Sequence, residues 1–206
     1  DGNLIAPDPG DQLFAEDQIS VFTHESDTAR TLEIFGKPVK RPERVIILGG
    51  GNVGLGVAQE LEASSTRIRA RMIEMNRANA ERAADALSRT IVLHGDGLDV
   101  DILREAGVER TDAVLCVTSD DKTNLLASVR VKSLGAKMAI ALVNDPTMVP
   151  LMEALDIDAY VNPRATTVSS ILRHIRHGRV KAVYSIGDAE AEVIEAEVLS
   201  TSSIAG

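Results

Sequence analysis

The segment GGGNVG holds the residues of this chain best suited to bind a ligand. Gly49, Gly51 and Gly54 fit the spacing G-x-G-x-x-G, after the strand-like run RVIIL and before a helix-like run. In that context the first glycine permits a tight turn, the second lets a pyrophosphate approach the backbone, and the third lets the helix pack closely on the strand. Phosphates would meet free N–H groups at the positive end of the helix dipole. Together with Asn52 and Val53, these glycines predict a dinucleotide site.

Glu74 ends the next strand-like run, about 20 residues beyond the last glycine, where a carboxylate binds ribose hydroxyls. A carboxylate there also repels a 2′-phosphate, so NAD or NADH is predicted rather than NADP, although Arg77 nearby would soften that preference. The alternative is an ordinary glutamate that faces solvent. The glycine spacing favours the ribose role.

Polar residues also follow the third and fourth predicted strands, whose carboxyl ends meet at the same edge of a parallel sheet. Asp96, in HGDGLD, is placed where an adenine would lie, whereas His94 is better explained as a histidine at the edge of the core. In TSDDKTN, Thr118 or Ser119 is expected to cap the following helix, and Asp121 to complete a capping box. Capping alone explains these residues, and a ligand contact would be additional.

The elements that position these residues alternate regularly between strand-like and helix-like runs. The six strand-like runs are residues 44–48, 67–74, 90–94, 112–118, 138–143 and 159–161. The helix-like runs that follow them are residues 52–64, 76–88, 100–107, 121–135, 147–156 and 165–178. The alternation predicts an α/β fold: a doubly wound, parallel, six-stranded sheet of the Rossmann type with helices on both faces.

The flanking sequence divides into shorter pieces. Residues 1–36 contain a predicted strand at QISVF, residues 37–43 (KPVKRPE) are expected to form a linker, and residues 44–163 the nucleotide-binding domain. Residues 164–179 are expected to form a further helix, and residues 180–206 contain two strand-like runs around GDAEAE. The chain does not begin with Met and ends directly after a strand-like run, so both ends are expected to be cut from a longer cytoplasmic protein.

Composition argues against several classes of partner. A net charge of −9 and the absence of Trp disfavour a nucleic-acid groove, which needs cationic and aromatic surfaces. No apolar run approaches the roughly 20 residues that span a bilayer. The single cysteine, Cys116, lies in the apolar run AVLCV and is expected to be a buried hydrophobic residue.

Catalytic patterns are missing from the sequence. The four histidines, His24, His94, His174 and His177, belong to no recognisable catalytic motif, and neither HExxH, GxSxG nor a P-loop is present. Two interpretations remain: a nucleotide-binding regulatory module without enzymatic activity, or the dinucleotide-binding domain of an NAD-dependent oxidoreductase that lacks its substrate domain. The first is favoured, because the sequence offers a nucleotide site without visible chemistry.

Several longer segments resemble the nucleotide-binding domain of the RCK/KTN family, whose members regulate potassium channels and transporters. The most specific are HGDGLDVDILREAGVERTDAVLCVTSDDKTN and NPRATTVSSILRHIR, supported by VIILGGGNVG and VNDP. The resemblance covers essentially the whole chain. It implies that residues 1–36 are the tail of one small ligand-binding domain of the RCK-C type, and that residues 180–206 are the start of a second.

The resemblance also implies a ligand site and an assembly. The nucleotide would lie on residues 49–54, Glu74, Asp96 and the segment Thr118, Ser119 and Asp120. The helix from Arg164 to His177 would pack on a second subunit, and dimers would form a ring under a membrane-embedded potassium transporter subunit, at the cytoplasmic face of the membrane. Asn52 replaces an Arg that suits a terminal phosphate in many members, which favours NAD or NADH over ATP or ADP.

Overall fold

The computed structural model describes most of the central part of the chain and parts of its flanks: residues 8–14, 17, 19, 21–36, 42–64, 67–175, 180–186 and 191–196. The chain divides into two units, residues 41–164 and residues 1–40 with 165–206, and each is described by itself. Most of the expected linker, residues 37–41, lies outside the described residues, as does the end of the last predicted helix, including His177. The expected domain limits stay a prediction.

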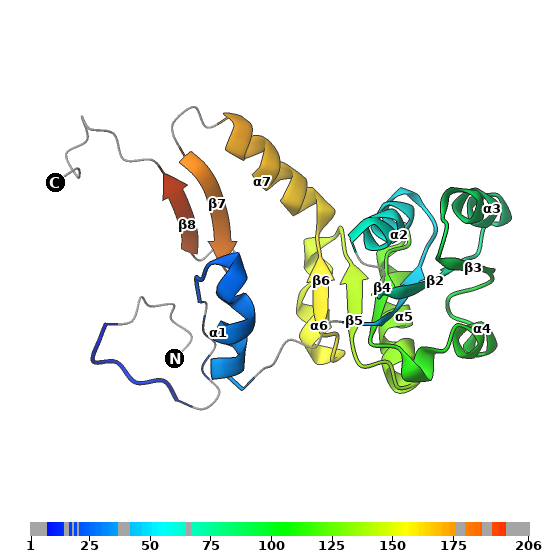
Figure 1. Cartoon of the computed structure of the whole chain (residues 1–206), viewed down its shortest axis with the longest axis horizontal. Helices are drawn as coiled ribbons and strands as arrows, with labels where there is room; N and C mark the ends of the chain where they lie inside the picture. The colour runs from blue at the N-terminus through cyan, green and yellow to red at the C-terminus, as the bar shows by residue number, and fades with distance from the viewer. Residues whose placement is uncertain are drawn as a thin grey trace. The chain divides into compact units, whose positions relative to one another are not determined.

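A six-stranded, entirely parallel sheet forms the centre of the first unit, with the order β3-β2-β1-β4-β5-β6 (Figure 1). Its strands are β1 (Arg44–Leu48), β2 (Arg69–Glu74), β3 (Ile91–His94), β4 (Ala113–Cys116), β5 (Ala139–Leu142) and β6 (Ala159–Val161). The order reverses direction between β1 and β4, as in a doubly wound sheet. The predicted fold class is confirmed.

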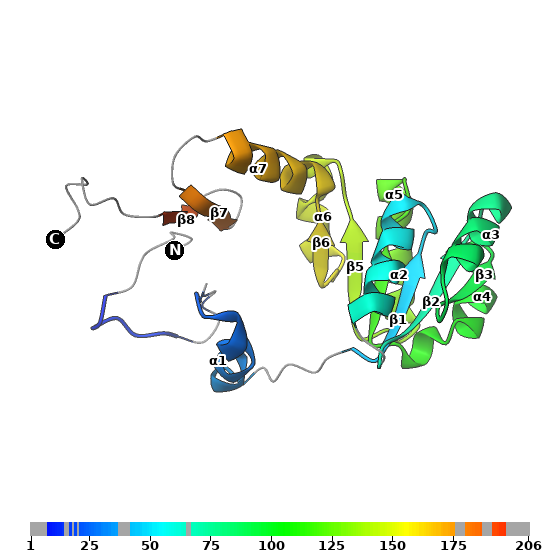
Figure 2. The ribbon, with the colours of Figure 1, turned by 45° about the horizontal axis from the view of Figure 1, so that its top comes forward.

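Helices cover both faces of this sheet, as Figure 2 shows from a second direction. On one face, α2 (Asn52–Ser64) and α3 (Arg77–Ala86) pack on Val45, Ile47 and Met72. On the other face, α4 (Val100–Glu105) and α5 (Asp121–Ser133) pack on Ile46, Leu48 and Val114. Short helical turns η2 (Val108–Arg110) and η3 (Pro146–Met148) and helix α6 (Pro150–Ala154) complete the connections.

Strands β1, β4 and β5 are apolar at nearly every position because both of their faces are covered. In β1 only Arg44 is exposed, and the four residues after it are buried. Cys116 of β4 is completely buried, and burial raises the pKa of its thiol to about 12 despite a hydrogen bond with Ser128. The cysteine is therefore a core residue, as its apolar neighbours indicate.

The second unit contains η1 (Glu25–Asp27), α1 (Thr28–Ile34), an antiparallel pair formed by β7 (Val180–Ile186) and β8 (Ala191–Ala196), and most of α7 (Pro163–Ile175). The pair matches the two strand-like runs around GDAEAE. The strand predicted at QISVF is wrong for its described residues: Ile19, Val21 and Phe22 are in irregular, exposed backbone. A strand needs a hydrogen-bonded neighbour, and within the described residues neither sheet supplies one. Of the helices in the described ranges, none is long and apolar enough to cross a bilayer.

Glu62, near the end of α2, fastens the turn that leads into β3. Its Oε1 accepts hydrogen bonds from the backbone N–H groups of Arg89 (2.8 Å) and Thr90 (2.7 Å), and its Oε2 accepts one from Ser88 (3.0 Å). Partial burial raises the pKa of this carboxyl, but these hydrogen bonds outweigh it and hold the pKa at about 2 instead of 4.5. The carboxylate form therefore stabilises the fold.

Replacing Glu62 with Gln should lower the free energy of unfolding at neutral pH by about 1 kcal/mol, because the charged acceptor is lost. The folded-state pKa lies below the unfolded one, so this contribution is complete above pH 4.5 and disappears as pH falls toward 2. Urea unfolding of both proteins across that range measures the difference. Glu60→Gln, at an exposed position of the same helix, is the control and should leave stability unchanged. A stability difference between the unmodified protein and the Glu62 variant that stays constant with pH would contradict the assignment.

Candidate functional site at the carboxyl ends of the strands

The glycine loop joins β1 to α2 at the point where the strand order reverses. Gly49 has φ of 108°, and a Cβ there would lie 3.0 Å from both Thr118 N and Val117 O. A Cβ on Gly54 would lie 1.9 Å from Gly49 O, so no side chain fits at that position. A Cβ on Gly51 would meet no atom within 4 Å. The first and third glycines are thus required by the fold, whereas the second faces open space.

Glu74 is bound to the same loop. Its Oε2 accepts a hydrogen bond from Gly50 N at 2.5 Å, and its Oε1 accepts one from Asn76 N at 2.7 Å. The residue is 9% exposed, so it is not the solvent-facing glutamate of the alternative interpretation. A carboxylate has about four acceptor positions, so two remain for hydroxyl donors.

Gly50 has a role that its place outside the fingerprint concealed. A Cβ on this residue would lie 3.1 Å from Glu74 Cβ and 3.1 Å from Met72 Sδ. Without a side chain at residue 50, the loop comes close enough for its N–H to reach the Glu74 carboxylate with no shift of Met72 or Glu74. The three consecutive glycines therefore serve three different purposes: a turn, a contact with Glu74 and an open surface.

The remaining residues of the loop and of the segment after β4 surround this point. Asn52 and Val53 are exposed in the first turn of α2. Thr118 adjoins Gly49 and is half-buried, whereas Ser119 and Asp120 are exposed.

The expected cap of α5 is wrong. Asp120, not Thr118 or Ser119, is the N-cap, and its Oδ2 accepts hydrogen bonds from Thr123 N (2.7 Å) and Thr123 Oγ1 (2.6 Å). The hydrogen bond from the Thr123 hydroxyl has the larger effect and the one from its backbone N–H the smaller. Both lower the pKa of Asp120 and keep it ionised. Its negative charge thus stabilises the N-terminus of α5.

Asp121 also differs from the expectation, because it completes no capping box. Its Oδ2 accepts hydrogen bonds from the backbone of Asn144 and Asp145, both at 2.8 Å, and its Oδ1 accepts one from Asn144 Nδ2. The side chain thus joins the start of α5 to the loop after β5. A capping box joins residues three apart in the sequence, so it could not predict a contact with this distant loop.

His94 and Asp96 lie at and just after the end of β3. His94 Nε2 lies 3.1 Å from Met75 O, which supports the structural interpretation of this histidine. Asp96 is exposed, and its Oδ1 accepts a hydrogen bond from Leu98 N at 2.8 Å. Gly97 lies beside the last residue of β1, because a Cβ there would lie 3.6 Å from Leu48 Cδ2.

Asn124, in α5, is the positioning residue that sequence reasoning missed. It is completely buried, and its Oδ1 accepts hydrogen bonds from Thr118 N (2.9 Å) and Thr118 Oγ1 (2.7 Å). Its Nδ2 donates to Thr118 O (3.1 Å) and to Leu142 O (2.9 Å). One amide thus ties the end of β4 to the end of β5. The only signal in the sequence was an Asn on the apolar side of a predicted helix.

Comparison with known proteins decides the family. Residues 45–163 match the TrkA-N domain. The chain is 45% identical over 206 residues to the Trk system potassium uptake protein TrkA of Azorhizobium caulinodans. It is 35% identical over 211 residues to the protein of the same name from Haemophilus influenzae. The chain belongs to the TrkA-N family. In both cases all of the chain aligns but only 45% of the relative, so it spans about half the length of these curated relatives.

Solved structures agree with the fold of this TrkA-N chain. The TrkA-N domain of inner membrane protein ybaL from Escherichia coli superposes with a TM-score of 0.59 and 15% identity, covering 67% of this chain and all of that one. The GsuK channel bound to NAD superposes with a TM-score of 0.58 and 20% identity, covering 73% of this chain and 26% of that one. At these identities the likeness establishes the fold.

Replacing Asn124 with Leu should lower the free energy of unfolding by about 2–4 kcal/mol, because buried groups of Thr118 and Leu142 lose their hydrogen-bond partners. Thermal or urea unfolding measures the loss. Asn79→Leu is the control, since that asparagine is half-buried in α3 and its side chain makes no hydrogen bond within the described residues. Equal stability of the two variants would show that the buried amide does not hold the strand ends.

Proposed function

We propose that this TrkA-N chain is a nucleotide-sensing regulatory module that binds NAD or NADH on the glycine loop and beside Glu74. The observation that carries the proposal is the open space at Gly51, flanked by the start of α2 and by the Glu74 carboxylate. A pyrophosphate fits against exposed N–H groups at a helix N-terminus, and a ribose diol fits beside a carboxylate. Asn52 supplies no cation for a terminal phosphate, which supports NAD or NADH over ATP or ADP.

Further contacts extend the proposed site along the carboxyl ends of the strands. Thr118 and Ser119 follow β4, next to the loop, and would face the second half of the dinucleotide. Asp96 follows β3, on the side of β2 and Glu74, and would face the adenosine half. Asp120 is ionised and already bonded to Thr123, so its contribution is to position the segment.

Replacing Gly51 with Val should raise the Kd for NADH by roughly 10-fold or more, equivalent to about 1.4 kcal/mol or more, because the side chain would occupy the space of the pyrophosphate. The fold should be retained, since the new atoms enter open space. Gly56→Val is the matched control, because a Cβ at Gly56 also meets no atom within 4 Å but lies further along α2. Calorimetric titration of each protein with NAD, NADH, ATP and ADP gives the ranking. Equal NADH binding by the Gly51 and Gly56 variants would place the ligand elsewhere.

The same proteins distinguish the regulatory module from a dinucleotide-dependent oxidoreductase. A dehydrogenase needs an acid or base beside the nicotinamide, and the ring of His94 is engaged with Met75 O. We therefore expect nucleotide binding without turnover of NAD against a panel of alcohols, hydroxy acids and aldehydes. Turnover that is lost in the Gly51 variant would favour the enzyme.

The regulatory role that we propose is control of potassium uptake through a membrane-embedded partner, at the cytoplasmic face of the membrane. The names of the TrkA relatives support it, as does the likeness of the fold to the GsuK channel. A nucleotide can shift such a partner between two states only if it binds one arrangement of the regulatory subunits more tightly than the other. This makes the contacts between subunits part of the mechanism.

We also propose that the chain pairs with a second copy of itself through α7, and that such pairs assemble into a ring. Val168 and Ile171 are 54% and 51% exposed and lie three residues apart, on one face of the helix. The side chains of Leu172 and Ile175, which continue this spacing in the sequence, lie outside the described residues. Apolar side chains at this spacing suit a self-complementary interface.

Replacing Ile171 with Asp should shift the protein from dimer toward monomer, because a charge would enter the apolar contact. Light scattering at several concentrations measures the molecular mass. Ile91→Asp is the matched control, because Ile91 is 54% exposed and lies on β3, at the other edge of the sheet from β6. Unmodified protein that is monomeric throughout would contradict the proposed pairing, and dimers of both variants would place the interface elsewhere.

A further inference from the structure

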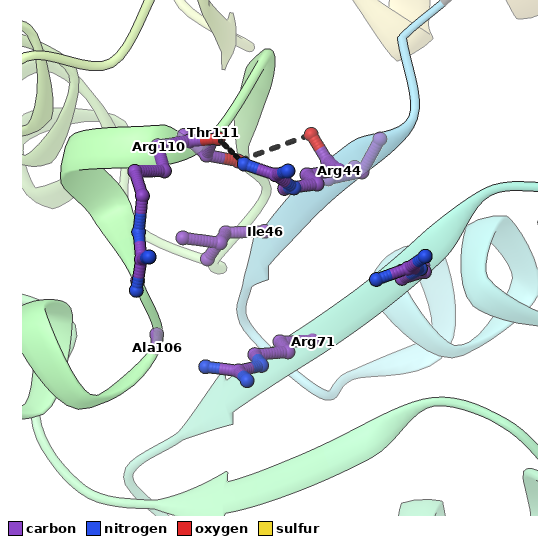
Figure 3. Close-up of a pocket in the computed structure, with 9 residues that line it drawn as sticks. Arg44, Ile46, Arg71, Ala106, Arg110 and Thr111 are labelled. Carbon is purple, nitrogen blue, oxygen red and sulfur yellow. Dashed lines mark hydrogen bonds between the residues drawn. The ribbon is translucent and has the colours of Figure 1, made fainter.

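Four arginines surround a cavity at the edge of the sheet opposite the glycine loop. The cavity has a volume of about 270 Å³ and is lined by Arg44, Val45, Ile46, Arg69, Arg71, Ala106, Gly107, Arg110 and Thr111. In Figure 3 the side chains of Arg71 and Arg110 extend toward one another from β2 and from η2, with Ile46 and Ala106 between them. This cavity, here called the arginine pocket, belongs to no part of the proposed nucleotide site.

Strand register explains why the arginines converge. Arg44 of β1 pairs with Arg69 of β2, and Ile46 pairs with Arg71. Because side chains alternate along a strand, these four residues of β1 and β2 project from the same face of the sheet. That face carries the core residues Ile46 and Ile73 and is covered by α4 and η2. Central strands of a doubly covered sheet are normally apolar, so two arginines at alternate positions of β2 are unusual.

The positive charge of the arginine pocket is not neutralised by its own walls. None of the nine lining residues, all of them described, is acidic. Arg44 Nη1 donates to Arg110 O (3.1 Å) and Arg71 Nη1 donates to Glu105 O (2.7 Å), and both of these acceptors are uncharged carbonyl groups. For Arg69 and Arg110 the described part of the chain shows no hydrogen bond or ion pair from the guanidinium group.

Nearby carboxylates are engaged elsewhere. Asp112 accepts hydrogen bonds from Glu43 N, Arg44 N and Lys137 Nζ, the last at 2.7 Å. Glu109 lies 3.7 Å from Arg104. Neither carboxylate lines the pocket. Four arginines thus line one cavity in a chain whose net charge is −9, and their like charges repel one another unless an anion joins them.

We propose that the arginine pocket binds the phosphate or diphosphate group of a small phosphorylated molecule or of a lipid headgroup. The planar donors of arginine match phosphate oxygens in pairs, better than the single charge of a lysine does. The volume of about 270 Å³ admits a small ligand, below the usual range for drug-sized ones. Ile46 and Ala106 offer an apolar wall for the carbon atoms next to the phosphate.

The pocket and the glycine loop are separate sites. Arg44 begins β1 and Gly49 follows its end, so a strand of about 16 Å divides them. An anion at the arginine pocket would hold the amino ends of β1 and β2 against η2. A dinucleotide at the loop would contact the opposite ends of the same strands. Binding at one place therefore requires no ligand at the other.

Inorganic pyrophosphate, titrated into the 206-residue chain by calorimetry, tests the proposal. The double variant Arg69→Gln, Arg110→Gln removes two charges whose guanidinium groups have no partner in the described part of the chain, so it should fold normally. Because the glycine loop is itself proposed to take a pyrophosphate, the substitutions are compared in the Gly51→Val background. There we expect them to weaken pyrophosphate binding roughly 10-fold or more, as loss of charge-assisted hydrogen bonds implies. The charge-matched control Arg30→Gln, Arg82→Gln, at exposed positions of α1 and α3, should bind as the unmodified protein does.

The Gly51→Val variant separates this site from the glycine loop. Pyrophosphate binding that survives in this variant and is lost when the Arg69 and Arg110 substitutions are added to it supports the proposal. The proposal is overturned if the unmodified chain binds no pyrophosphate, if adding the Arg69 and Arg110 substitutions to Gly51→Val leaves the binding unchanged, or if Gly51→Val abolishes all binding.

Vesicles distinguish the source of the phosphate. Sedimentation of the chain with phosphatidylcholine vesicles that contain phosphatidic acid, but not with pure phosphatidylcholine, would support a lipid headgroup, provided that the Arg69, Arg110 variant fails to sediment. Absence of sedimentation, together with pocket-dependent pyrophosphate binding, would support a soluble ligand. Sedimentation that is unchanged in the Arg69, Arg110 variant would count against the pocket as a lipid site.

Discussion

The approach of Gly54 to the carbonyl of Gly49 is the contact on which the arrangement of the first unit depends. A side chain at residue 54 would lie 1.9 Å from that oxygen, so α2 can follow β1 through a short turn only with glycine at this place. The contact puts the first turn of α2 beside the ends of β2 and β4. Glu74 then reaches Gly50, and Thr118 adjoins Gly49. Three separate segments of the chain meet at one point because one methyl group is missing.

Local pattern was sufficient to predict a doubly wound parallel sheet, the succession of strands and helices along the chain, and the glycine loop. Short apolar runs such as RVIIL, bounded by glycine and alternating with longer helix-like runs such as NVGLGVAQELEAS, are typical of strands in a parallel sheet. The family was likewise predictable, because long segments matched it, and the comparisons confirmed it. Glycine spacing pointed to Gly49 and Gly54 for the same reason: backbone geometry there is decided by residues close in sequence.

Side-chain partners across strands were not predictable, since they depend on register. Asp120 was expected to contact a ligand and Asp121 to complete a capping box, yet Asp120 caps α5 and Asp121 reaches the loop after β5. Asn124 looked like one polar residue in a helix, but it bridges two strand ends. The arginines of RIRARMIE were visible as alternating charges, whereas their convergence with Arg110 required the pairing of β1 with β2. Apolar residues such as Ile19 and Phe22 led to a strand prediction that was wrong, because an apolar pattern forms a strand only where another strand pairs with it.

The anchoring of the glycine loop has a consequence for signalling. Gly49 N donates to Ile73 O at 2.9 Å and Gly50 N to Glu74 at 2.5 Å, so hydrogen bonds within the protein hold the shape of the loop. A preorganised surface loses little conformational entropy on binding, which favours affinity. It also changes little in shape, and an element with one shape cannot report which molecule has arrived. If the proposed NAD or NADH binds there, discrimination between its oxidised and reduced forms would rest with the nicotinamide end of the ligand, away from the loop.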